Sequence, residues 1–131
     1  MIRLQDILRE SSILDTITIS DIGRVACKWD TGNTTKASSL HATNMQVDGN
    51  QVTWLFNGHT YSAEITGYSE PRGKARRPII TKQITWKDKT VTVPVALTDR
   101  SNNTADFLCN MDLMQQLGIQ LDTANKRAYS N

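Results

Sequence analysis

Two turn dipeptides in the middle of the chain constrain its fold more than any other feature. An Asp-Gly pair at 48–49 and an Asn-Gly pair at 57–58 each separate two short runs of β-branched and apolar residues. Both dipeptides tolerate the positive φ of tight hairpin turns, so they predict antiparallel strand pairs. Further runs of this kind lie at residues 13–19, 25–29, 79–86, 90–97, 107–109 and 119–121. With about nine strands joined by short turns, the chain is predicted to be an all-β barrel or sandwich.

Helical patterns are short and lie near the two ends of the chain. Residues 110–117 fit a short helix, with Asn110 as its N-cap and Gly118 as its C-terminal stop. Apolar residues at roughly helical spacing in residues 2–9 leave a second, N-terminal helix open.

Length and composition narrow the class of protein. The 131 residues suffice for one domain, and a net charge of +2 is too small to indicate nucleic-acid binding. No apolar run reaches the roughly 20 residues of a membrane span, and no signal-peptide pattern is present. Cys27 and Cys109 are therefore expected to be reduced, buried thiols in a cytoplasmic protein. The two cysteines lie too far in sequence from each other and from His41 and His59 to form a zinc-binding motif, so no metal is expected. The sequence also contains no Gly-rich phosphate-binding loop, so no nucleotide or other cofactor is expected.

The segment most informative about chemistry is Asp30-Thr31-Gly32, which follows an apolar run and opens a polar stretch. An aspartic peptidase needs a carboxylate at such a strand end, facing a second carboxylate, so that the two share one proton. The protonated carboxyl polarises the scissile carbonyl, and the ionised one takes a proton from the attacking water. As a bare tripeptide, the same segment is also a common turn.

Four blocks in the same order resemble the retropepsin-like family often called ATP-dependent zinc proteases. They are residues 30–42, which begin with Asp-Thr-Gly, and residues 77–80, 95–100 and 107–114. The resemblance implies a small closed retropepsin barrel at residues 23–131, after an N-terminal extension at residues 1–22. It also implies that Asp30 is catalytic, that Thr31 braces the loop, and that Gly32 lets the carboxyls approach. Because the chain has one Asp-Thr-Gly segment, a dyad requires a homodimer.

The basic segment at residues 67–77 lies where the family has its flap, which closes over substrate and excludes water. Its cations would favour acidic peptides or an acidic partner. The expected substrate contacts are Asn33, Arg72, Lys74, Arg76 and Arg77. The alternative interpretation is a mobile, solvated loop whose charges only keep it soluble.

Three departures from the family pattern favour a second function. Asn33 and Asn110 stand where the family has small residues, and Met111 stands where retropepsins have an Arg that anchors the catalytic strand. Asp99-Arg100 is the candidate substitute for that ion pair. The alternative function is that of a catalytically inactive module with this fold, which has a structural or peptide-binding role in a larger assembly, such as a viral one.

The expected partners are the same for both functions. They are a second copy of the chain and an extended peptide or protein, with no membrane and no nucleic acid. The expected location is the cytoplasm or, for a viral protein, the host cytoplasm or the virion.

Overall fold

A computed structural model describes residues 12–130, which contain twelve strands and one short helix. The first half of the chain holds β1 (Ser12–Ile19), β2 (Gly23–Asp30), β3 (Ser38–His41), β4 (Thr43–Asp48), β5 (Gln51–Phe56), β6 (His59–Glu64) and β7 (Gly67–Ser69). The second half holds β8 (Arg77–Trp86), β9 (Lys89–Thr98), β10 (Phe107–Cys109), α2 (Met111–Leu117), β11 (Ile119–Asp122) and β12 (Arg127–Ser130).

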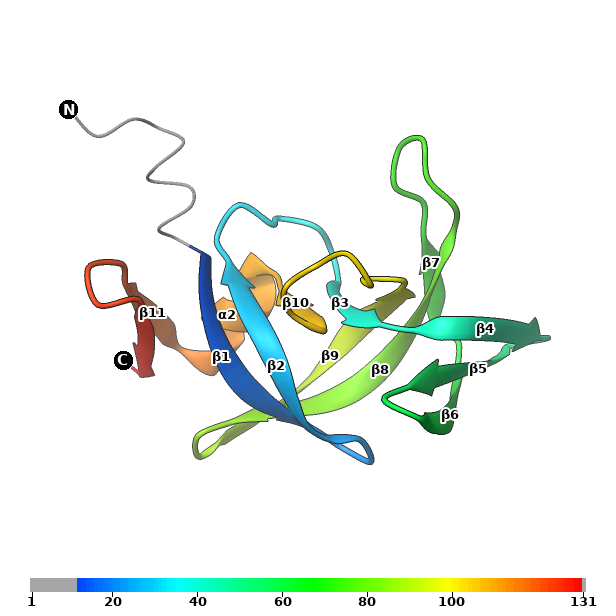
Figure 1. Ribbon diagram of the computed structural model, residues 1–131, viewed down its shortest axis with the longest axis horizontal. Helices are drawn as coiled ribbons and strands as arrows, with labels where there is room; N and C mark the ends of the chain where they lie inside the picture. Colours follow the sequence, from blue (N-terminus) through cyan, green and yellow to red (C-terminus); the bar gives the residue numbers. More distant parts are fainter. Residues whose placement is uncertain (1–11, 131) are drawn as a thin grey trace.

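Six of these strands close into a barrel (Figure 1). Their order is β1-β2-β10-β3-β9-β8, and pairing of β1 with β8 completes the ring. The β2–β10 and β3–β9 pairs are parallel, whereas the other neighbours are antiparallel. Inward-facing side chains fill the interior, among them the fully buried Trp29, Leu40, Ile80, Leu97 and Phe107. The predicted all-β class, closed barrel and short C-terminal helix are confirmed.

A second sheet of three strands, β4-β5-β6, packs beside the barrel. The second hairpin turns at the predicted Asn57-Gly58, both with positive φ, whereas the first turns at Gly49-Asn50, one residue beyond the predicted pair, with positive φ at Gly49. One face of β5 is buried in the common hydrophobic core through Val52, Trp54 and Phe56. The hairpin predictions from the two turn dipeptides are therefore confirmed.

The helix α2 begins and ends where the sequence predicts. The Asn110 side chain accepts a hydrogen bond from Leu113 N, and Gly118 closes the helix at φ 66°. The positive φ is the reason that glycine suits this position, because a side chain would be strained there. Leu113, Met114 and Leu117 bury the inner face of the helix.

Three features differ from the sequence-based expectations. β1 lies within the segment predicted as an extension, yet it pairs with both β2 and β8, so the barrel includes residues before 23. Residues 67–69 and 77 belong to strands, which leaves residues 70–76 as the connecting loop. β12 is not predicted from the sequence, because its residues show no apolar alternation and it forms a strand only by pairing with β11. The helix expected at residues 2–9 lies outside the described residues.

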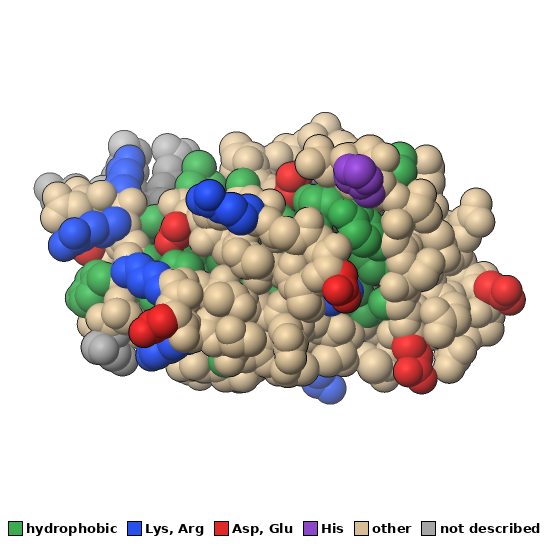
Figure 2. Space-filling model, turned by 90° about the horizontal axis from the view of Figure 1, so that it is seen from below, with side chains coloured by type: hydrophobic (Ala, Val, Ile, Leu, Met, Phe, Trp, Pro, Cys, Tyr) green, Lys and Arg blue, Asp and Glu red, His purple; other side chains and the backbone are tan. Residues whose placement is uncertain are grey.

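The two ends of the barrel differ in what they carry. Residues 31–37, the tip of the β7–β8 hairpin and residues 99–106 come together at one end (Figure 1). From the opposite end, Lys and Arg side chains are more frequent toward β11, and acidic side chains toward β4-β5-β6 (Figure 2). This agrees with the absence of Lys and Arg from residues 37–71 of the sequence. Within residues 12–130, no helix has the length and apolar character to cross a membrane.

Candidate active site

Asp30 is the last residue of β2 and stands half-buried at the loop-bearing end of the barrel. The preceding residue, Trp29, is fully buried, and its indole N–H donates to Asp15 Oδ2 at 3.2 Å. Pairing of β2 with β1 on one side and β10 on the other holds the strand in place. The position of the Asp30 backbone is thus set by the barrel wall rather than by the loop that follows.

A tight turn follows Asp30. Gly32 N donates to Asp30 Oδ1 at 3.0 Å, and Asn33 N donates to the Asp30 carbonyl at 3.1 Å. A Cβ at position 32 would lie 3.4 Å from Asp30 Oδ1, so glycine leaves the carboxylate uncrowded on this side. Thr31 is half-buried, and its side chain makes no hydrogen bond to any residue in the described range 12–130. Within the same range, the turn fixes Asp30 Oδ1 and no hydrogen bond engages Oδ2.

Asn110 clamps the rest of this loop onto α2. Its side chain accepts from Ser38 Oγ and donates through Nδ2 to the Thr35 carbonyl at 2.8 Å, in addition to capping the helix. Its backbone N–H donates to Ser38 Oγ, and Met111 N donates to the Asn33 carbonyl at 2.8 Å. Asn110 is 2% exposed. Buried polar groups that are fully hydrogen-bonded make a rigid connection, so the loop after Asp30 is held to the helix at both its ends.

Arg100 is a buried cation close to this loop-bearing end of the barrel. It is 8% exposed, its Nε donates to the Ala105 carbonyl at 3.1 Å, and its backbone N donates to His41 Nδ1 at 2.8 Å. Burial lowers the pKa of Arg100 and the charge of Arg77 lowers it further, whereas Asp106 and Asp30 raise that pKa. Arg100 therefore stands in the electrostatic field of Asp30, while Met111 packs partly buried against the core.

The β7–β8 hairpin has an internally braced tip. The Arg76 guanidinium lies 3.7 Å from the centre of the Tyr68 ring and 4.0 Å from Glu70 Oε1. Lys74 N donates to the Pro71 carbonyl at 3.0 Å. A cation over an aromatic face contributes about 0.5–1 kcal/mol at an exposed site. Arg76 thus stiffens the hairpin instead of reaching into a cavity.

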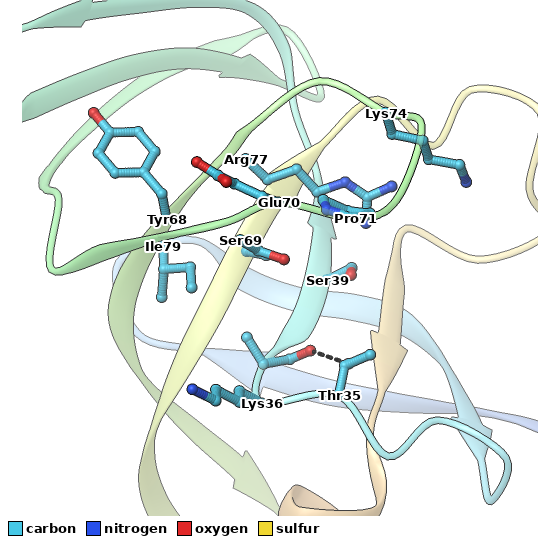
Figure 3. Close-up of a pocket in the computed structure, with 12 residues that line it drawn as sticks. Thr35, Lys36, Ser39, Tyr68, Ser69, Glu70, Pro71, Lys74, Arg77 and Ile79 are labelled. Carbon is cyan, nitrogen blue, oxygen red and sulfur yellow. Dashed lines mark hydrogen bonds between the residues drawn. The ribbon is translucent and has the colours of Figure 1, made fainter.

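A cavity of about 480 Å³ lies beneath this hairpin (Figure 3). In that view Lys74 and Arg77 lie on one side of the cavity and Tyr68 on the other, with Ser39 and Ser69 between them. A second cavity of about 270 Å³ shares Thr35, Ser39, Lys74 and Arg77 with the first. Because they share these residues, the two cavities are adjacent, and we refer to them together as the groove.

The structure brings together only part of the predicted site. Of the predicted substrate contacts, Lys74 and Arg77 line both cavities and Asn33 lines the smaller one. Exposed Arg72 and Arg76 line neither, and neither do the predicted catalytic residues Asp30, Thr31 and Gly32. The Asn33 side chain also accepts from Thr35 N at 3.0 Å, so it stabilises its own loop.

Several groove residues were not predicted as contacts. They include Thr35, Lys36, Ser39, Tyr68 and Arg100. Thr35, Lys36, Ser39 and Arg100 lie in residues 35–42 and 95–100, which belong to the blocks that resemble the peptidase family. That resemblance was the feature of the sequence from which these contacts could have been predicted. Within residues 12–130, no group of three or more His, Cys, Asp or Glu side chains is placed to hold a metal ion.

Comparisons with known proteins support the fold but do not identify the chain. No family model and no curated protein matches the sequence. The structure is similar to the crystal structure of a Legionella pneumophila protein of unknown function, DUF785, with a TM-score of 0.70 and 24% sequence identity. The similarity covers 86% of this chain and 91% of that chain. At this identity the likeness shows a common fold alone.

Proposed function

We propose that this protein is an aspartic peptidase that acts as a homodimer, with Asp30 of each copy contributing one carboxyl. The observation that carries the proposal is the frame around Asp30. The carboxyl stands at the end of a buried strand, accepts the Gly32 N–H, and precedes a loop clamped by Asn110. Two carboxyls that share one proton tolerate little displacement. A frame of this rigidity suits that requirement.

The groove supports an extended peptide as substrate. β7 is the terminal strand of the barrel sheet among the described residues, so its outer edge offers backbone groups to a peptide strand. Lys74 and Arg77 would favour acidic peptides, as the sequence predicts. In the dimer, one Asp30 carboxyl would polarise the scissile carbonyl and the other would take a proton from the attacking water.

The first experiment tests the role of Asp30. Purified protein is incubated with a mixture of synthetic peptides, and the products are identified by mass spectrometry. Asp30→Asn should abolish cleavage and leave the circular dichroism spectrum unchanged. Asp48→Asn, at an exposed position in the β4–β5 hairpin, is the matched control and should cleave as the wild type does. Equal turnover by Asp30→Asn and wild type would refute the proposal.

The second experiment tests the shared dyad. When wild type is mixed with an equal amount of Asp30→Asn, the total number of dimers doubles and only about a quarter of them hold two aspartates. The activity should therefore fall to about half of that given by the same amount of wild type alone. A peptidase that works as a monomer would keep its full activity. The rate should also be bell-shaped in pH, because one carboxyl must be protonated while the other is ionised.

A second candidate function is a peptide-binding module without catalysis. The observation that favours it is that Asp30 lines neither cavity, so the groove can hold a peptide without that carboxyl. This function predicts that wild type and Asp30→Asn bind the same peptides equally and that neither cleaves them. Fluorescence anisotropy with labelled peptides, together with the cleavage assay, separates the two functions.

A further inference from the structure

The side chain of Arg100 is buried, yet most of its hydrogen-bonding capacity is unused. Guanidinium has five N–H donors. Within residues 12–130, the one hydrogen bond that the Arg100 side chain makes is that of Nε to the Ala105 carbonyl, and no carboxylate forms an ion pair with it. Its terminal nitrogens are not sealed from solvent, since the one buried side-chain nitrogen or oxygen without a partner in this part of the chain is Trp54 Nε1. Those nitrogens therefore have open donors.

Arg100 helps to line the smaller cavity. Lys74 and Arg77 line the same cavity, and Asp99 is its single acidic side chain. Asp99 is already engaged, because it accepts from both the backbone N and the hydroxyl of Ser101. The lining of this cavity therefore carries three cations and one carboxylate, and outside the lining Asp106 and Asp30 also act on Arg100. Arg100 also experiences repulsion from Arg77, which an anion between them would relieve.

The two cavities differ in the character of their walls. The larger cavity has apolar and aromatic walls from Tyr68, Pro71, Ile79 and Ala96, and Arg100 does not line it. Its further charged residues are Lys36 and Glu70, and Glu70 Oε1 also lies 4.0 Å from Arg76 Nε. Two neighbouring cavities with cations shared between them, a further cation in the smaller one and apolar walls in the larger one suit a ligand whose negative charge lies at one end. A peptide with a free C-terminus is such a ligand.

We propose that the smaller cavity is a binding site for the C-terminal α-carboxylate of a peptide, with the Arg100 guanidinium as its main contact. A planar guanidinium pairs with a carboxylate through two parallel hydrogen bonds, and burial strengthens such a pair. Lys74 and Arg77 add positive charge, and the preceding side chains of the peptide lie toward Tyr68. The inference rests on the proposed function, because the peptide bound here is the peptidase's own substrate. Binding of its C-terminus in this cavity would limit cleavage to bonds near a free C-terminus.

The test measures binding on the Asp30→Asn background, so that cleavage cannot interfere. Fluorescence anisotropy compares N-terminally labelled peptides of one sequence, ending in a free acid or in an amide. The free acid should bind about tenfold more tightly, as expected for a charge-assisted pair. Arg100→Lys and, separately, Arg77→Gln should reduce this preference, whereas Arg72→Gln, at an exposed position that lines neither cavity, should keep it.

Specific results would overturn the inference. Equal binding of acid and amide refutes it, and so does an amidated peptide with one internal glutamate that binds as tightly as the free acid. Because Arg100 is buried, circular dichroism must show that Arg100→Lys is folded. If it is not, the Arg77→Gln result decides. Cleavage by wild type is measured separately. If wild type cleaves peptides but the protein binds the free acid and the amide equally, only this inference is refuted. If the protein binds the free acid more tightly but wild type cleaves nothing, only the proposed peptidase activity is refuted.

Discussion

Replacing Asn110 by alanine should destabilise the protein by about 3 kcal/mol. The change removes the N-cap of α2, which is typically worth about 1 kcal/mol. It also leaves the Ser38 hydroxyl without its acceptor and the Thr35 carbonyl without its donor, at about 1 kcal/mol each. For a chain of this length the loss corresponds to a fall of roughly 10 °C in the melting temperature.

Urea unfolding followed by tryptophan fluorescence measures this loss. Asn110→Ser can still cap the helix but is too short to reach Thr35, so it should lose about 2 kcal/mol and recover the capping contribution. Asn102→Ala, at an exposed position of the 99–106 loop, is the control and should stay within about 0.5 kcal/mol of wild type. Hydrogen exchange should accelerate at residues 33–38 in Asn110→Ala and not in the control.

The reasoning fails if Asn110→Ala unfolds within about 0.5 kcal/mol of wild type. It also fails if exchange accelerates at α2 but not at residues 33–38, because the clamp on the loop after Asp30 would then be absent. In either case the rigid frame invoked for Asp30 would lose its main support.

Three further predictions concern buried and acidic groups. Asp15→Ala removes the carboxylate oxygen that accepts from two buried tryptophan indoles, so the unfolding free energy should fall by about 2–4 kcal/mol in urea unfolding, and an unchanged value would contradict this role. Burial raises the pKa of the Cys109 thiol, and Cys27 is equally shielded, so iodoacetamide should alkylate neither cysteine in native protein and both in urea, as read by mass spectrometry. Hydrogen bonds from Ser101 lower the pKa of Asp99 below its ordinary 3.8, so the ionised form stabilises the fold above that value and the contribution is lost as pH falls through the lowered pKa. Stability of Asp99→Asn should therefore depend less on pH below about pH 4 than that of wild type.

The local parts of the fold could be predicted because they depend on neighbouring residues. The turns at Gly49 and at Asn57-Gly58 need positive φ, and Asn110 with Gly118 marks both ends of a helix, so each signal acts within a few residues. The strand β12 and the inclusion of β1 in the barrel could not be predicted, because each depends on pairing with a partner chosen by the whole sheet.

The candidate site divides in the same way. The sequence by itself determined that a carboxylate would end an apolar strand at Asp30 and that a basic loop would follow later in the chain. Only the tertiary structure decided which cations share a cavity, because Arg77 and Arg100 lie 23 positions apart in sequence and come together only when β8 pairs with β9 along its whole length. It also decided that Arg76 folds back onto Tyr68 and that Asn110, a departure from the family pattern, holds the loop after Asp30. Burial and contacts between distant residues arise from the closed barrel, and no local pattern encodes them.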